Sequence, residues 1–172
     1  MPIIPDEKDW TWVLSTPCKE CGFDASTVTP STVPGTVMSM LPRWRAALRR
    51  PDVSQRPNDS TWSTLEYACH VRDVFSLFDS RLNLMLHEDN ARFENWDQDQ
   101  TAIDKDYSGA DPAEVSAELT AEGKQVAESF ASVRDGQWRR RGFRSNGSEF
   151  TVLTLGQYFL HDVVHHLHDV DG

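Results

Sequence analysis

Residues 160–170 read Leu-His-Asp-Val-Val-His-His-Leu-His-Asp-Val, and this stretch carries the strongest signal for both the fold and a site. Its apolar residues recur at helical spacing, so we predict a final helix that Thr154 caps and that runs to the C-terminus. Four of the six histidines of the chain lie in this stretch. Because neutral imidazole is the commonest metal ligand, the pattern indicates a metal site on a helix.

Three further helices are predicted upstream, which makes the chain an all-α four-helix bundle with long connections. Pro42 lies inside the first helix, where it would remove one hydrogen bond and could kink it. The second helix follows a capping box formed by Ser63 and Glu66. Each of these three helices has apolar residues at helical spacing and a start or stop signal. They are predicted to cover about residues 33–50, 63–88 and 111–133.

The rest of the chain is predicted to be connections and an arm. A stretch rich in Pro, Thr and Ser precedes the first helix, so residues 1–32 are expected to form an irregular N-terminal arm. Residues 10–14 read as a short extended segment within it. Residues 33–172 would form the bundle, as one domain overall. The long connection after residue 88 is as typical of a functional lid as of a wrapping segment, and a hairpin is expected around Asn146-Gly147.

Composition excludes several classes of function. A net charge of −10 disfavours nucleic-acid binding, which requires neutralisation of phosphates. No apolar run approaches the length of a membrane span and no secretory signal is evident, so we expect a cytoplasmic protein without a membrane partner. The one basic cluster, Arg139–Arg141 with Arg144, is expected in a loop. It could hold one anionic group of a small ligand, although a solvated charge run is the favoured interpretation.

The three cysteines predict neither a disulfide framework nor an obvious metal site. Cys18 and Cys21 form a single Cys-x-x-Cys, and a structural zinc ion would need two more ligands that no second cysteine pair supplies. Inert turn thiols are therefore favoured, with a zinc or redox module as the alternative. Cys69 is expected to face away from the apolar stripe of its helix, and only its position beside His70 makes it a candidate.

Helical geometry offers two ligand pairs on the last helix. Residues four apart share one face, which pairs His161 with His165 and Asp162 with His166. The second pair lies at the rim of the apolar stripe, as His70 does on its own helix, whereas His165 points away from that stripe. We therefore favour His70, Asp162 and His166, keep His161 and His165 as the alternative, and expect most of the other histidines to face solvent. A solvated histidine-rich surface helix remains the non-functional alternative.

These residues resemble a known family. Trp62-Ser63 followed by Cys69-His70-Val71, together with residues 162–170, is similar to the DinB-like superfamily, which includes mycothiol-dependent maleylpyruvate isomerase and a thiol-transferase branch. The resemblance covers most of the chain from about residue 33. Asp162 stands where the family has His or Glu, and reading His161-Asp162-Val163-Val164-His165 as the His-Asp-x-x-His of other branches gives the competing register.

The resemblance implies a four-helix bundle in which His70, Asp162 and His166 hold a divalent metal ion. Zinc is the expected ion, with nickel, manganese and iron as alternatives. The implied activity is that of an S-transferase or isomerase that uses a low-molecular-weight thiol such as mycothiol and a small electrophile. Arg144 and Trp96 would orient the thiol. The alternative is a non-catalytic, stress-associated bundle that binds a metal or a partner, and the surface also permits a homodimer.

Overall fold

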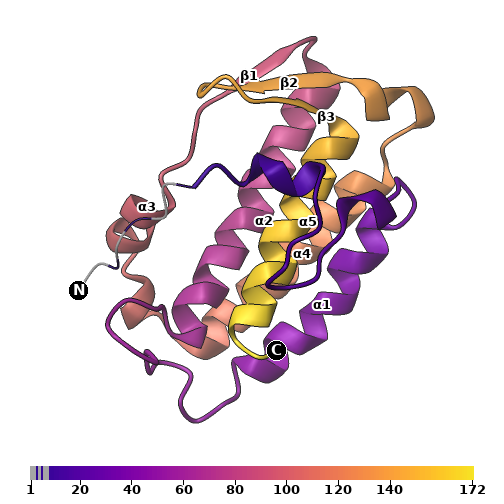
Figure 1. Cartoon of the computed structure of the whole chain (residues 1–172). Helices are drawn as coiled ribbons and strands as arrows, with labels where there is room; N and C mark the ends of the chain where they lie inside the picture. The colour runs from indigo at the N-terminus through magenta and orange to yellow at the C-terminus, as the bar shows by residue number, and fades with distance from the viewer. Residues whose placement is uncertain (1–2, 4, 6–7) are drawn as a thin grey trace.

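Four long helices make up the frame of the computed structural model, which describes residues 3, 5 and 8–172 (Figure 1). Helix α4 packs against α1 and α2, and α5 packs against the same two helices. The four-helix bundle predicted from the sequence is confirmed. The four helices are α1 (Val33–Ala47), α2 (Thr64–His87), α4 (Pro112–Ala131) and α5 (Val152–Asp169).

Local hydrogen bonds explain where the two site-bearing helices begin. In α2, the Ser63 hydroxyl accepts from the Glu66 N–H, and a Glu66 carboxylate oxygen accepts from the Ser63 N–H, as the capping box predicts. The prediction that Thr154 caps α5 is wrong. Thr151 caps this helix by accepting from the Thr154 N–H at 3.1 Å, because the preceding strand leads directly into Val152. Pro42 leaves α1 continuous from Val33 to Ala47.

A small sheet covers one end of the bundle and was not predicted beyond its hairpin (Figure 1). Strand β1 (Ala91–Phe93) runs parallel to β2 (Arg141–Arg144), which pairs antiparallel with β3 (Glu149–Thr151). The hairpin around Asn146-Gly147 is confirmed, and Gly147 has the positive φ of 92° that glycine adopts without strain. The fold is therefore mostly helical. The small sheet brings together segments that are far apart in the sequence, because β1 pairs with β2.

The long connection and the N-terminal arm carry more structure than the sequence indicates. The connection contains α3 (Gln98–Asp104) and a 3₁₀ turn at Tyr107–Gly109. Trp10–Leu14 form a 3₁₀ helix and not the predicted extended segment, because the Asp9 carboxylate accepts from the Thr11 N–H and closes the turn. This turn packs across α5, as Figure 1 shows.

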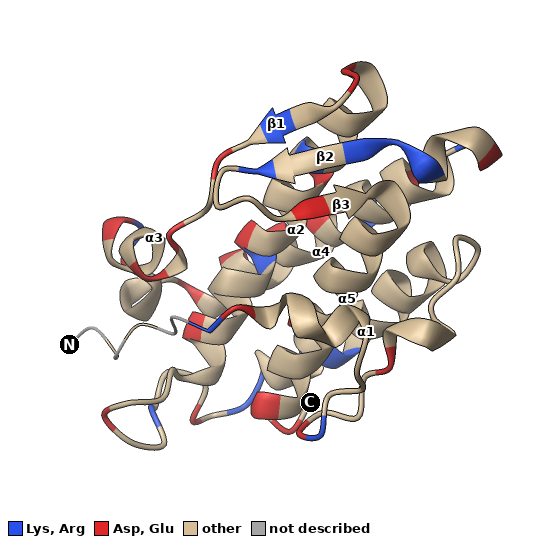
Figure 2. Ribbon diagram, turned by 45° about the horizontal axis from the view of Figure 1, so that its top comes forward, with Lys and Arg blue, Asp and Glu red and all other residues tan. Residues whose placement is uncertain are grey.

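The basic cluster lies partly on a strand and not in the predicted loop, and Figure 2 shows its positive charge along β2. Arg141 pairs with Glu149, and Arg140 pairs with Asp89. Both are thus surface ion pairs, whereas Arg144 is buried. Among the described residues, no helix combines the length and the apolar character that crossing a membrane requires.

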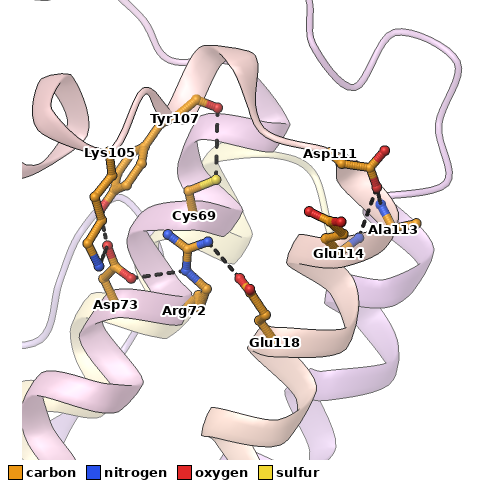
Figure 3. A network of polar contacts seen from close by, with 9 residues as sticks. All are labelled: Cys69, Arg72, Asp73, Lys105, Tyr107, Asp111, Ala113, Glu114 and Glu118. Atoms are coloured by element: carbon orange, nitrogen blue, oxygen red, sulfur yellow. Dashed lines mark hydrogen bonds and ion pairs between the residues drawn. The ribbon is translucent and has the colours of Figure 1, made fainter.

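A polar network around Asp73 fixes the connection to α2 (Figure 3). The Asp73 carboxylate accepts from the Tyr107 hydroxyl at 2.6 Å and from Arg72 Nε at 3.0 Å, and it pairs with Lys105 Nζ at 3.0 Å. Burial opposes ionisation of Asp73, but the hydrogen bonds from Arg72, Tyr107 and Lys105 outweigh it and lower the pKa of this carboxyl. The network stabilises α2 one turn from His70.

We expect Asp73→Asn to lower the free energy of unfolding by about 1–3 kcal/mol at pH 7, because Arg72 and Lys105 lose a charged acceptor. A carboxyl whose pKa is lowered by folding stabilises the protein above about pH 4, and this contribution is lost as the pH falls through the folded-state pKa. The difference in urea midpoint between variant and wild type should therefore narrow below about pH 4. Glu118→Gln, which removes an exposed partner of Arg72, serves as the control with a small effect. A difference that is constant from pH 7 to about pH 3 would contradict this account.

Candidate metal centre

Three potential ligand atoms from two helices converge at one point. His70 Nε2 on α2 lies 3.2 Å from Asp162 Oδ1 on α5, and His166 Nε2 lies 3.4 Å from the same oxygen. Ligand atoms of the three residues all lie within 4.8 Å of one another. Asp162 and His166 share a face of α5 because they are four residues apart. Two imidazoles and one carboxylate suit zinc or another first-row divalent ion and leave coordination positions open.

Neighbouring side chains fix the orientation of both imidazoles. The ring of Trp96 stacks on His70 with centroids 5.4 Å apart and an interplanar angle of 14°. The ring of Trp62, which immediately precedes the N-cap of α2, has its centroid 5.5 Å from that of His70. On α5, His166 Nδ1 lies 3.0 Å from Asp169 Oδ2. An Nδ1–H donated to that carboxylate leaves the Nε2 lone pair of His166 directed at the centre, as metal-binding histidines require.

The electrostatics of the centre favour the protonation states that bind a cation. Burial lowers the pKa of His70, so its imidazole is neutral at pH 7. Burial opposes ionisation of Asp162, but the adjacent His70 and His166 outweigh it and hold the pKa of this carboxyl below its usual range. A neutral imidazole and a carboxylate are the forms that coordinate a metal. The donor set therefore fits a divalent ion.

His161 and His165 belong to a second cluster and not to the first. They lie with Cys18 and Cys21 of the N-terminal arm, and ligand atoms of these four residues are within 4.8 Å of one another. The prediction that most histidines of the last helix face solvent is wrong, because His161 is 4% and His165 8% exposed. The helical pattern of apolar residues indicates only which side of α5 faces the bundle core. It does not indicate that the N-terminal arm covers the opposite side, where these histidines are buried. Which cluster binds a metal stays a prediction.

A cavity of about 650 Å³ opens beside the first centre. Asp162 and His166 line it, and so do Trp96 and Arg144, the two residues predicted to orient a ligand. The Arg144 guanidinium reaches the Tyr158 hydroxyl at 3.3 Å. A volume of this size suits a small-molecule site, for which about 300–1,000 Å³ is usual.

Arg81 also lines the cavity and was missed from the sequence. Its guanidinium donates to the Glu94 carbonyl at 2.8 Å and lies 4.8 Å from the Phe93 ring centroid. Among the described residues, neither Arg81 nor Arg144 has a carboxylate within ion-pair distance. Burial and the nearby Arg144 lower the pKa of Arg81 to about 10, so it remains charged at pH 7. The sequence pattern could have indicated Arg81, because it follows Phe78 by three residues and therefore lies on the apolar stripe of α2.

Cys69 is not part of either centre. It was expected to face away from the apolar stripe, but it is completely buried, with Sγ 3.9 Å from the Tyr107 carbonyl oxygen (Figure 3). Packing of the connection over this side of α2 explains the difference. Burial raises the pKa of Cys69 to about 12, which keeps it a protonated, unreactive thiol.

Comparisons with known proteins agree with this fold. The model of the DinB superfamily matches residues 38–170. The solved structure of YfiT from Bacillus subtilis, described as a probable metal-dependent hydrolase with an unusual four-helix bundle topology, is similar to this chain with a TM-score of 0.73 and 18% identity. The similarity covers 99% of this chain and 92% of YfiT. No significant match is found among curated proteins.

Proposed function

The chain belongs to the DinB superfamily, and we propose that it is a metal-dependent enzyme that transfers a low-molecular-weight thiol to a small electrophile or uses such a thiol in an isomerisation. One observation carries this proposal. The three convergent ligand atoms of His70, Asp162 and His166 adjoin a cavity of about 650 Å³. Two arginines, Arg81 and Arg144, line this cavity and have no carboxylate partner in the described part of the chain. Three protein ligands with open positions are typical of catalytic and not structural metal sites.

The chain's own residues have distinct roles in this proposal. His70, Asp162 and His166 would hold the divalent ion, which lowers the pKa of a bound thiol and polarises a carbonyl when present. Arg81 and Arg144 would bind an anionic group of the substrate or thiol, since both are charged and buried at the cavity wall. Trp96 shields His70 from water by stacking on it.

The nucleophile would come from a small molecule and not from the protein. Among the described residues, no cysteine lines the cavity. The resemblance to the thiol-transferase branch of the family points to mycothiol as the first thiol to test. A cavity of this volume accommodates a drug-sized ligand, which leaves room for a thiol beside an electrophile.

The test is turnover by zinc-loaded protein with mycothiol, coenzyme A or cysteine and a panel of electrophiles that carry a carboxylate. We expect thiol consumption that a chelator abolishes and added metal restores. Turnover of esters or amides without any thiol would replace the proposal with hydrolysis. The similarity to YfiT, described as a probable metal-dependent hydrolase, makes hydrolysis the second candidate. Metal binding without turnover of any substrate would leave a non-catalytic metal-binding bundle and overturn both.

We expect Arg144→Gln to raise KM for a carboxylate-bearing substrate by roughly tenfold or more, since a hydrogen bond to a charged group contributes about 1.5–3 kcal/mol. The kcat should change less, because this arginine binds the substrate away from the reacting atoms. Steady-state kinetics with the acid and with its neutral amide measure the effect. Arg141→Gln is the matched control, because Arg141 is exposed on the same strand and pairs with Glu149. An equal loss with acid and amide would show that Arg144 does not bind the anionic group.

A further inference from the structure

The second ligand cluster joins the N-terminal arm to α5. We propose that Cys18, Cys21, His161 and His165 bind a structural zinc ion that fastens the arm to the bundle. Both pairs have the spacing of structural zinc sites, since Cys-x₂-Cys is followed by His-x₃-His. Cys18 and His165 are brought together across a sequence separation of 147 residues.

The distances fit a tetrahedral shell. Zinc bonds of about 2.3 Å to sulfur and about 2.0 Å to nitrogen place neighbouring ligand atoms roughly 3.3–3.8 Å apart. Cys18 Sγ lies 3.7 Å from His165 Nδ1, and ligand atoms of all four residues lie within 4.8 Å of one another. Bringing every pair of ligand atoms to these separations requires each pair to approach by about 1.5 Å or less.

The outer nitrogen of His165 is already held by carboxylates. Its Nε2 lies 3.3 Å from Glu20 Oε2 and 3.7 Å from Asp169 Oδ1, while its Nδ1 faces Cys18. An Nε2–H donated to a carboxylate fixes the tautomer with its lone pair on Nδ1, directed at the cysteines. This carboxylate–histidine arrangement is the usual support of a zinc-binding imidazole.

His161 provides independent support. Its Nε2 is buried and has no hydrogen-bond partner among the residues that the structure describes, although such an atom is costly to leave unpaired. The ring lies between two aromatic side chains of the arm, 5.5 Å from Trp10 and 5.6 Å from Phe23. A metal ion bound to His161 Nε2 would give this buried nitrogen the partner that its aromatic neighbours cannot provide.

The backbone of the arm presents both cysteines on one turn. The Cys18 N–H donates to the Phe23 carbonyl at 2.8 Å, and the Gly22 N–H donates to the Cys18 carbonyl at 2.8 Å. Gly22 adopts a φ of 75°, which glycine tolerates without strain. The turn thus closes around Cys18 and Cys21 in a conformation that needs glycine directly after the second cysteine.

Four protein ligands fill a tetrahedral shell, which makes this a structural and not a catalytic site. Two thiolates neutralise the charge of the zinc ion, so the second site adds no net positive charge beside the first centre. Trp10 and Glu20 of the arm line the cavity. The zinc ion would therefore hold one wall of the cavity in place.

The test is cobalt(II) binding by metal-free protein under reducing conditions. A cysteine-bound tetrahedral cobalt ion gives intense visible absorption and a thiolate-to-cobalt charge-transfer band. We expect wild-type protein to bind two cobalt ions and show this band, and the double variant Cys18→Ser with Cys21→Ser to bind one and lose the band. Cys69→Ser is the matched control, because Cys69 lies outside the cluster, and it should keep both ions. His70→Ala should lose one ion and keep the band, which separates this site from the first centre.

Absence of the band from fully loaded wild-type protein would overturn the proposal, and so would its survival in the variant that lacks both Cys18 and Cys21. The wild-type spectrum decides the matter even if that variant does not fold. A second measurement uses the zinc-loaded protein and a mercurial reagent. Release of one zinc ion in step with modification of two thiols supports the site, whereas modification without zinc release contradicts it.

Discussion

His70→Ala should reduce the affinity of the first centre for zinc by more than about 100-fold, since loss of even an outer partner of a metal ligand costs about 10–100-fold. The variant removes one of three ligands, and the two left on α5 cannot close the shell from their own helix. Metal-dependent turnover should be lost with the metal. Competition against a chromophoric chelator measures the affinity, and circular dichroism checks that the bundle is intact.

The matched control is His87→Ala, because His87 lies at the exposed end of the same helix and contacts only the Asn83 carbonyl among the contacts described. Its zinc affinity should equal that of wild type. His70→Gln serves as a second variant of similar size in case alanine destabilises the fold. Unchanged zinc affinity of the first centre in both His70 variants would remove His70 from the site.

Phe159→Ala should lower the free energy of unfolding by about 3–5 kcal/mol, which is at the upper end of the range for single core substitutions. The ring is completely buried on α5, where it lies 5.3 Å from Phe78 of α2 and 5.8 Å from Phe130 of α4. Truncation leaves a cavity where three helices meet. Since domains are stabilised by about 5–15 kcal/mol, this is a large fraction of the total.

Urea unfolding at neutral pH measures the effect, and the melting temperature should fall by roughly 6–20 °C. Leu153→Ala is the control on the same helix, because Leu153 is partly exposed and should cost on the order of 1 kcal/mol. Equal costs for the two substitutions would show that Phe159 does not anchor α5 between α2 and α4.

Local patterns were sufficient to predict the helices. The predictions used signals that act within one or two helical turns, namely apolar spacing, the Ser63–Glu66 capping box and the Asp111-Pro112 start. Because these signals are local, helices α1, α2, α4 and α5 lie close to the predicted ranges. The same angular argument placed Asp162 and His166 at the rim of the apolar stripe, where the structure brings them to His70.

Contacts between distant segments could not be predicted in this way. The burial of His165 depends on the arm, which has no helical period and whose path over α5 is not encoded locally. Strand β1 pairs with β2 across about fifty residues, and its three residues alternate too briefly to be recognised. Cys18 and Cys21 lie beside His161 and His165 from the far end of the chain, and no local pattern in the sequence indicates this contact.

Anomalous diffraction from crystals of the zinc-loaded protein, measured on both sides of the zinc absorption edge, tests the central claim most directly. We predict an anomalous peak about 2.0–2.2 Å from His70 Nε2, Asp162 Oδ1 and His166 Nε2, on the cavity side. No peak at this position in fully loaded protein, with zinc found only elsewhere, would contradict the assignment of the first centre.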